Sequence, residues 1–274
     1  ERIPRPPAED VLSGARGESK EGYVHQLHFY YPQSGGVGAF FKKMVEQLPT
    51  NVELQVSKRI KVLRPEADGY LVELENGPSH RFDKIINCMP AHELIACMDA
   101  EISVEDDLSA YADKLKYNSL YYGLLVYSKD NAGNNFSFNF PEKEMTIHRA
   151  SLVNFLGNHN FRDQRAFLCE ATYREGTEMA GMAERDLVEK FSTDLEYAGL
   201  ASRCDFVGAE IRAEKYAYVM YDINHRKNKS AYLNCLRGLG IPSCGRFAEF
   251  EYYNIDHVVG SALQLCGQLN RSWN

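Results

Sequence analysis

The sequence predicts an α/β fold of the mixed α+β kind, built around an antiparallel sheet. Aromatic residues are abundant, with 17 Tyr and 14 Phe against a single Trp among 274 residues, and aromatic side chains favour β-strands. Strand-like runs fill residues 118–174 and 205–222, whereas helical periodicity is confined to separate segments around them. The hydrophobic content of 44%, the charged content of 25% and the mean hydropathy of -0.42 are typical of a globular protein and exclude a membrane-embedded one.

The charge and the cysteines restrict the partners and the compartment. A formal net charge of -7 disfavours nucleic acid and anionic lipid as partners, and no apolar run approaches the ~20 residues of an integral membrane segment. Seven cysteines are scattered without a CxxC pair, which favours free thiols in a reducing, cytoplasmic location over disulfides or a zinc site. The histidines show no metal-ligand spacing with a supporting acid, so we expect no metal.

The chain opens with a segment that does not resemble a folded element. Residues 1–19 are rich in Pro, Gly and charge, which predicts a peripheral arm. Because ERIPRPPAED has no initiator Met and no signal peptide, we expect the chain to be a fragment of a longer protein.

The next elements are a strand, a helix and a β-meander. GYVHQLHFYYP (22–32) predicts a strand, and AFFKKMVEQL (39–48) has the pattern of a helix that ends at Pro49. Residues 52–77 predict a meander with turns at Glu66–Gly69 and Glu75–Pro78.

Two short elements follow the meander. Lys84, Ile85, Ile86 and Cys88 predict an apolar strand that stops at Pro90, and a helix is expected over about 91–98.

The central and C-terminal parts are predicted from the same patterns. Leu187, Phe191 and Leu195 share one face of an expected helix over 181–199, and Asn254 should cap a helix that begins near Ile255 and ends at Gly267. The other expected elements are strands at 118–128, 134–140, 145–155 and 165–174, a strand-rich stretch at 205–222, and a short helix at 230–239.

Two segments could contact a ligand through backbone amides. Gly35–Gly38 separates an expected strand from a helix, where amides can meet a phosphate or a planar cofactor; without a GxGxxG pattern, a tight turn is the simpler interpretation. Asn254 and Asp256, preceded by Gly245-Arg246, would direct amide donors and a positive helix dipole at an anionic oxygen or a flavin edge. An ordinary capped helix explains that segment equally from physics alone.

Side chains offer a second kind of candidate. Arg149 is a lone arginine in an apolar strand pattern, and its planar fork suits phosphate oxygens, although pairing with an acid is the commoner outcome. Several tyrosines could line a polyol or phosphate pocket or could be core aromatics instead: Tyr216, Tyr218, Tyr221, Tyr252 and Tyr253. No GxSxG is present, and we find no nucleophile triad.

Three segments together resemble the flavin-containing amine oxidase superfamily, which includes protoporphyrinogen oxidase and UDP-galactopyranose mutase. YYPQSGGVGAFFKKMVEQL is similar to its "YP-x-GG-x-G" segment. The stretch from VSKRIKVLRP to IINCMP resembles its meander and strand ending in "T-x-P", with Cys88 in place of the threonine. GRFAEFEYYNIDHVVGSALQL resembles the terminal FAD segment and is closest to the mutase-like branch. Their order and spacing agree with the family across nearly all of residues 20–270.

The resemblance implies roles for individual residues. Arg149, Tyr218 and Tyr252 stand where mutase-like enzymes hold the substrate diphosphate, and no catalytic residue is assigned. The residues implied to lie along FAD are Gly35, Gly36, Val37, Val56, Ile60, Cys88, Gly245, Arg246, Asn254, Ile255 and Asp256. The glycine turn and the C-terminal helix would thereby converge on one flavin ring.

The resemblance also implies an organisation. The chain should be the C-terminal part of a two-domain FAD-binding flavoprotein: residues 20–104 and 240–274 as the FAD-side layer, and 105–239 as an antiparallel-sheet substrate domain. The family's dinucleotide-binding GxGxxG segment is not in this sequence, so we expect weak or no FAD binding, and no activity, from this polypeptide alone.

Three functions stay open. The full-length protein would be an enzyme, either a mutase-like isomerase of a nucleotide sugar in cell-surface polysaccharide synthesis or an amine oxidase- or desaturase-type oxidoreductase on an apolar substrate. The third reading is a non-catalytic protein. An anion held between Arg149 and Tyr252 would favour the first, a dry aromatic tunnel the second, and a collapsed pocket with Arg149 paired to an internal acid the third.

Overall fold

The computed structural model describes residues 7–16, 29–99, 108–157, 161 and 163–272. The chain divides into two compact units, one formed by residues 1–49 and 154–162 and the other by 50–153 and 163–274. Each unit is described by itself. The domain boundaries expected from the sequence stay a prediction.

The first unit contains two helices, α1 (Ala8–Ala15) and α2 (Gly36–Glu46). Gly35 and Gly36 have φ angles of 77° and 60°, a left-handed conformation that glycine adopts without the steric cost of a Cβ. The tight turn predicted before this helix is therefore confirmed. The strand expected at 22–32 is not observed where the structure describes it, at residues 29–32, and its earlier part lies outside the described residues.

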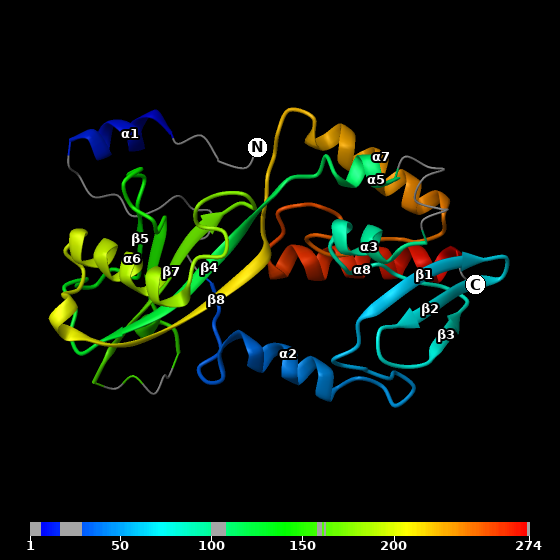
Figure 1. The fold of residues 1–274 in the computed structure, drawn as a ribbon, viewed down its shortest axis with the longest axis horizontal. Coiled ribbons are helices and arrows are strands. Elements are labelled where there is room, and N and C mark those ends of the chain that lie inside the picture. The colour runs from blue at the N-terminus through cyan, green and yellow to red at the C-terminus, as the bar shows by residue number, and fades with distance from the viewer. Residues whose placement is uncertain (1–6, 17–28, 100–107, 158–160, 162, 273–274) are drawn as a thin grey trace. The chain divides into compact units, whose positions relative to one another are not determined.

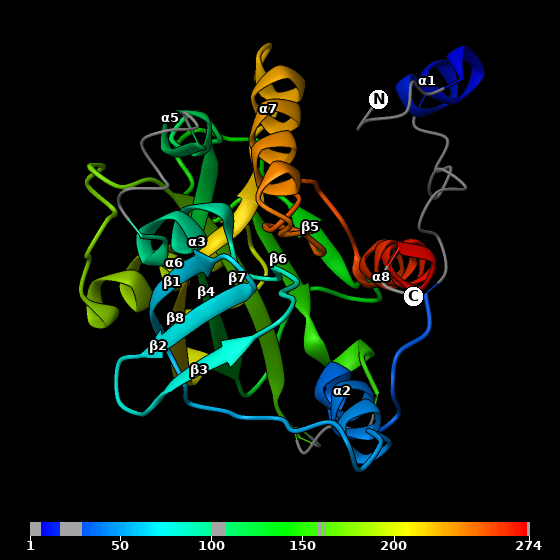
Figure 2. The ribbon, with the colours of Figure 1, turned by 90° about the vertical axis from the view of Figure 1, so that its right-hand side faces the viewer.

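The second unit contains a three-stranded antiparallel sheet of β1 (Ile60–Glu66), β2 (Gly69–Leu74) and β3 (Ser79–Phe82), in that order. The turns fall where the sequence predicted them, whereas residues 52–59 form no strand. Figure 2 shows this sheet with α3 (Ala91–Cys97) beside β1. Its core is shared with two more helices, α5 (Leu108–Ala112) and α7 (His225–Gly238).

The larger sheet of this unit has the strand order β5-β6-β7-β4-β8, with every neighbouring pair antiparallel. Figure 1 shows that β4 begins close to α5 and that β8 leads into α7. The strands are β4 (Tyr117–Tyr127), β5 (Ser137–Asn139), β6 (Arg149–Leu152), β7 (Arg165–Tyr173) and β8 (Phe206–Val219). The predicted mixed α and β fold class is thus confirmed.

One face of the larger sheet is covered by α6 (Glu184–Tyr197). Leu187, Phe191 and Leu195 are fully buried there, as their helical spacing predicted, against inward-facing residues of β4 and β7. Among the described residues, short 3-10 turns are found at Val153–Phe155 and at Arg203–Asp205.

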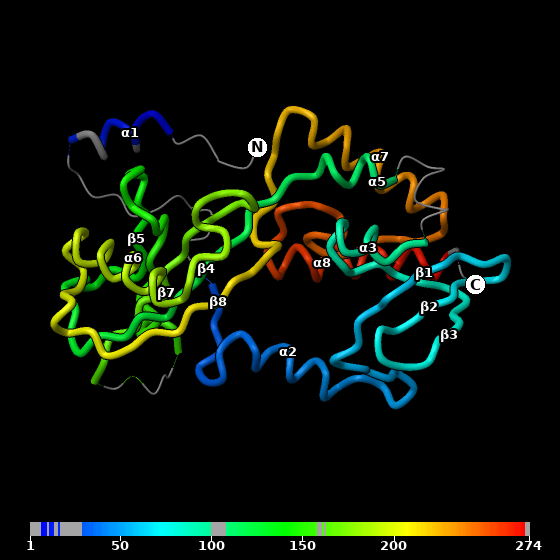
Figure 3. Tube along the Cα trace, viewed as in Figure 1, coloured from blue at the N-terminus to red at the C-terminus, as the bar shows by residue number. Residues whose placement is uncertain are grey.

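The C-terminal helix α8 (Ile255–Ser272) follows an irregular segment after α7, which Figure 3 traces. The amide of Val258 donates to the carbonyl of Asn254 at 3.0 Å, so Asn254 stands at the predicted cap position. The expected end at Gly267 was wrong, because α8 continues through it. A glycine without a positive φ is compatible with an uninterrupted helix at the cost of about 1 kcal/mol.

Two other predicted boundaries were also wrong. Residues 84–88 form no strand: a single parallel bridge joins Asn87 to Ser243, and no partner strand extends it, so a ladder cannot propagate. Helix α7 begins at His225 rather than at residue 230. Burial of His225 and Asn228 against the core adds a first helical turn that the polar composition of HRKNK did not suggest.

Candidate functional site

A polar cluster lies on the sheet face opposite α6. Residues directly opposite each other on neighbouring strands project to the same face, and Arg149 of β6 is opposite Glu170 of β7. The residues on either side of Glu170, Cys169 and Ala171, point the other way into the core beneath α6. The strand alternation therefore places the arginine and the glutamate together, away from that helix.

Glu170 is the centre of this cluster. Its Oε1 accepts hydrogen bonds from Arg149 Nε at 3.0 Å and from Arg149 Nη2 at 2.6 Å. Its Oε2 accepts the phenol proton of Tyr218 at 2.8 Å, from β8 on the far side of β4. Arg149 Nη2 also donates to the Tyr218 hydroxyl at 3.3 Å. The Glu170 side chain is only 8% exposed, whereas that of Arg149 is 41% exposed.

The protonation states follow from these contacts. Burial opposes the charged form of Arg149, but the adjacent Glu170 carboxylate outweighs it, so the pKa of Arg149 is raised. Burial and the hydrogen bond to Glu170 raise the pKa of Tyr218 to about 12. Burial lowers the pKa of His148, whose Nε2 lies 3.9 Å from Glu170. At neutral pH Arg149 is therefore a guanidinium and Tyr218 is a protonated phenol.

Tyr252 and Arg246 extend the cluster from the irregular segment before α8. The ring of Tyr252 stacks on that of Tyr218, with centroids 6.2 Å apart and planes inclined by 15°. The Arg246 guanidinium lies over the Tyr252 ring at 4.4 Å and near the Tyr218 ring at 5.6 Å. Arg246 Nη2 also donates to the carbonyl of Ala217 at 2.6 Å. The structure thus brings together the three residues that the sequence named for one ligand.

Glu170 is not among the site residues predicted from the sequence. Arg149 was expected to face a ligand, with an acid as the alternative partner, and Glu170 is that acid. The available signal was RAFLCEATYR, in which one glutamate interrupts an apolar strand, because an acidic residue at such a position is buried only when it has a partner. The Arg149 side chain is nevertheless 41% exposed, so solvent reaches the guanidinium beside its acidic partner.

The residues expected along FAD belong to both units. Gly35, Gly36 and Val37 are in the first unit and the others are in the second, so their predicted convergence stays a prediction. Val56 is 71% exposed in a segment without regular structure, and Ile60 begins β1.

The remaining residues of that set lie near α8 and the Asn87–Ser243 bridge. Gly245 has a φ of 109°, and a Cβ placed on it would meet nothing within 4 Å. Asn254, Ile255 and Asp256 are exposed at the start of α8. Cys88 is an exposed free cysteine beside the bridge residue Asn87.

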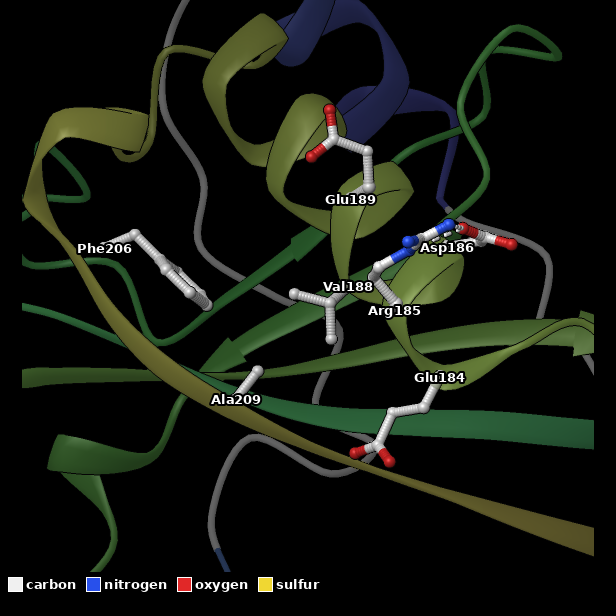
Figure 4. A pocket seen from close by; sticks show the side chains of 7 residues that line it. All are labelled: Glu184, Arg185, Asp186, Val188, Glu189, Phe206 and Ala209. Atoms are coloured by element: carbon white, nitrogen blue, oxygen red, sulfur yellow. Dashed lines mark hydrogen bonds and ion pairs between the residues drawn. The ribbon is translucent and has the colours of Figure 1, made fainter.

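A separate groove lies between α6 and β8, away from the cluster (Figure 4). It has a volume of about 700 Å³. Its lining is Glu184, Arg185, Asp186, Val188, Glu189, Phe206 and Ala209. None of the residues predicted to bind substrate or cofactor lines it, and an acidic rim does not suit an anionic ligand.

The described part of the chain contains no group of three or more His, Cys, Asp or Glu side chains that could hold a metal ion. Within the same residues, no helix has the length and apolar character needed to cross a membrane.

Comparison with known proteins identifies the fold. No protein-family model matches the sequence, and no curated protein sequence matches it significantly. Among solved structures, a reduced UDP-galactopyranose mutase superposes with a TM-score of 0.75 at 19% identity, over 88% of this chain and 52% of that one. A putative protoporphyrinogen oxidase from Exiguobacterium sp. 255-15 superposes with a TM-score of 0.70 at 12% identity, over 86% of this chain and 51% of that one. A putrescine oxidase with a redesigned cofactor site superposes with a TM-score of 0.63 at 12% identity, over 87% of this chain and 53% of that one.

This chain therefore shares its fold with these three solved structures, and that fold agrees with the resemblance found in the sequence. This chain spans about half the length of each of the three solved structures.

Proposed function

We propose that this chain forms the substrate side of an FAD-dependent enzyme and that Arg149, Tyr218 and Tyr252 bind the diphosphate of a nucleotide sugar, in a mutase-like isomerase of cell-surface polysaccharide synthesis. The observation that carries the proposal is the single cluster formed by these three side chains. The family resemblance implies that the same three side chains hold one ligand. The fold similarity to a UDP-galactopyranose mutase supports the same assignment.

The charges of the cluster suit an anion. Arg149 is paired with the Glu170 carboxylate, and the Arg246 guanidinium over the Tyr252 ring adds a further positive charge to the cluster. Among the described residues, Arg149 Nη1 has no hydrogen-bond partner, so one edge of its fork can donate to a phosphate oxygen while Nε and Nη2 stay on Glu170. The Tyr218 hydroxyl gives its one proton to Glu170 in this structure and would donate to an anion by turning that proton away from the carboxylate.

The residues of the second unit fit one edge of a planar cofactor. The start of the 18-residue helix α8 is exposed, and helix N-termini favour groups that carry negative charge. Open space in front of Gly245 allows a flat ring to approach the backbone there. FAD, when bound, would supply the electron-transferring ring that the chain's own side chains cannot replace.

In this proposal, the chain's own residues orient the substrate. Arg149 and the two stacked tyrosines would hold the diphosphate, and restricting its position lowers the entropic part of the reaction barrier. The positive charge of the cluster would stabilise a diphosphate leaving group as its bond to the sugar breaks. Glu170 would keep Arg149 in one orientation by its two hydrogen bonds.

Two other functions have support from particular observations. The fold similarity to a putrescine oxidase and to a putative protoporphyrinogen oxidase favours the amine oxidase- or desaturase-type oxidoreductase, for which an apolar substrate was expected. The Arg149–Glu170 pair favours a non-catalytic protein, because the arginine already has an acidic partner. An anion-binding measurement separates both from the mutase-like function.

The test is calorimetric titration of the purified chain with UDP and with inorganic pyrophosphate. We expect both to bind, and we expect Tyr218→Phe and Arg149→Met to weaken binding by about 10- to 100-fold, the range for hydrogen bonds to charged groups. Arg212→Met is the matched control, because Arg212 lies on the same sheet but its side chain is 67% exposed and paired with Glu210. Absence of binding to the folded wild-type chain, or equal loss in the control, would refute the proposal.

A further inference from the structure

The Tyr252 ring belongs to a part of the chain without regular structure. Residues 251–254 lie between the turn after α7 and the start of α8 and are in no helix or strand. Yet the ring stacks on Tyr218 at 6.2 Å and holds the Arg246 guanidinium at 4.4 Å. A loop side chain needs an anchor to keep such a position, because fixing a backbone residue costs about 1–2 kcal/mol of conformational entropy.

The anchor is a relay of two hydrogen bonds. The backbone amide of Tyr252 donates to the Tyr221 hydroxyl at 2.8 Å, and that hydroxyl donates to Glu251 Oε2 at 2.7 Å. A carboxylate can only accept, so the phenol proton of Tyr221 must point to Glu251. The lone pairs of the same oxygen then face the Tyr252 amide. The ionised Glu251 therefore determines which way the Tyr221 hydroxyl is oriented.

Helix α7 fixes the other oxygen of Glu251. Lys229 Nζ donates to Glu251 Oε1, and the two side chains are 21% and 23% exposed. His225 Nε2, one helical turn before, lies 3.9 Å from the same oxygen. Burial lowers the pKa of His225, so Lys229 is the charged partner at neutral pH. Burial opposes the ionisation of Glu251, but the Lys229 and Tyr221 hydrogen bonds outweigh it and lower its pKa.

Glu251 thus connects three parts of the second unit. Tyr221 lies just beyond the end of β8, Lys229 lies on α7, and Glu251 precedes Tyr252 in the segment before α8. The same strand β8 carries Tyr218, the residue on which Tyr252 stacks. Because the relay ends on the Tyr252 backbone, it sets the height and tilt of the ring relative to Tyr218.

We propose that Glu251, through Tyr221, is a positioning residue that holds Tyr252 in the anion-binding cluster, with Lys229 of α7 as its fixed counter-ion. The inference rests on the proposed function for the meaning of the cluster. The inference goes beyond the proposed function because it assigns a role to Glu251, Tyr221 and Lys229, which are not among the residues proposed to bind the ligand.

The first measurement does not depend on any ligand. The chain is labelled with ¹³C at the ε positions of tyrosine, and the Tyr252 ring signal is assigned with Tyr252→Phe. Stacking on Tyr218 displaces this signal from the free-tyrosine position in the wild type. We expect Tyr221→Phe, which deletes one oxygen atom, and Glu251→Ala to return it toward that position. Tyr70→Phe is the matched control, because it deletes a hydroxyl that donates to Leu239 at 2.8 Å elsewhere in the same unit.

The second measurement tests positioning against a general structural defect. Pyrophosphate affinity should fall about three- to tenfold in Tyr221→Phe and Glu251→Ala, the range for one neutral hydrogen bond, and stay unchanged in Tyr70→Phe. In a Tyr252→Phe background, Glu251→Ala should cause no further loss, whereas a general defect would add to it.

The outcomes are distinguishable. If Tyr221→Phe is folded and its Tyr252 signal does not move, the positioning role is overturned, and this single-atom variant decides even if Glu251→Ala does not fold. If the signal moves in the variants but wild-type chain binds no pyrophosphate, the positioning stands and the proposed function fails. If the Glu251→Ala loss persists in the Tyr252→Phe background, Glu251 acts on the structure in general and the proposal is wrong.

Discussion

Removing Glu170 should reveal how strongly the buried cluster stabilises the fold. Glu170→Leu keeps the volume of the side chain but removes the acceptor of three hydrogen bonds, two from Arg149 and one from Tyr218. Breaking a fully buried ion pair by deleting one partner costs about 3–5 kcal/mol, because a charge is left uncompensated. The Arg149 side chain is 41% exposed, so water can solvate the unpaired guanidinium and reduce this cost. We therefore expect a loss of about 2–3 kcal/mol in the free energy of unfolding.

The assay is urea unfolding followed by far-ultraviolet circular dichroism, with linear extrapolation to water. For a protein of this size, the expected loss corresponds to a fall in melting temperature of about 5 °C. A double-mutant cycle isolates the interaction. Arg149→Met in the Glu170→Leu background removes the stranded charge, so the double variant should be more stable than Glu170→Leu alone by about 1–2 kcal/mol.

A surface pair supplies the control for this cycle. Arg81 and Glu66 form an ion pair whose side chains are 74% and 31% exposed, and exposed pairs contribute about 0–1 kcal/mol. The reasoning is refuted if Arg149→Met and Glu170→Leu are additive within about 0.5 kcal/mol, because independent effects would mean that the two side chains do not depend on each other.

Two further predictions concern the core beneath α6. Asp194 accepts hydrogen bonds from the amides of Thr146 and Ile147 at 2.7 and 2.9 Å, and burial raises its pKa. Its protonated form is therefore favoured in the folded state, and the stability it contributes is present at low pH and lost as pH rises through the raised pKa; Asp194→Asn should remove this pH dependence. Gly123→Ala would place a Cβ too close to Ile211 Cδ1 and 3.2 Å from a ring carbon of Phe191, and this overpacking should cost about 1–3 kcal/mol.

Each of these two variants has a matched control. Asp186→Asn changes a 52% exposed acid on the same helix and should leave the pH dependence of unfolding unaltered; an unchanged pH profile in Asp194→Asn would contradict the assignment. Gly208→Ala adds a Cβ on β8 with nothing within 4 Å, so it should be within about 0.5 kcal/mol of wild type. Equal stability of the two alanine variants in urea would show that α6 does not pack tightly over Gly123.

Local patterns in the sequence were enough to predict the elements whose stability comes from one buried face. The spacing of Leu187, Phe191 and Leu195 predicted α6, and all three are buried. Alternation predicted β4 and β7 within a residue or two of their observed ends. The glycine pair before α2 predicted a tight turn, which both φ angles confirm. In these cases the residues that determine the structure are neighbours along the chain.

The predictions that failed depended on contacts between distant segments. Residues 84–88 are apolar enough for a strand but meet a single bridge partner, Ser243. The helix α8 continues through Gly267, where an isolated glycine is tolerated in a helix. The sequence pattern describes what a segment can form, whereas the presence of a pairing strand depends on where other segments pack.

Patterns along the chain were sufficient to predict the mixed fold class and the main helices and strands, whereas the grouping of Arg149, Tyr218 and Tyr252 around one ligand was implied by the family resemblance and stays a prediction. The tertiary structure alone decided that Glu170 sits between Arg149 and Tyr218 and that Glu251 is connected to Tyr252 through Tyr221. The two kinds of feature differ in the sequence separation of the residues that interact. Helix and strand patterns reflect interactions between residues close in the sequence. Glu170 and Glu251 acquire their partners through strand register and the packing of α7, which bring together residues far apart in the chain.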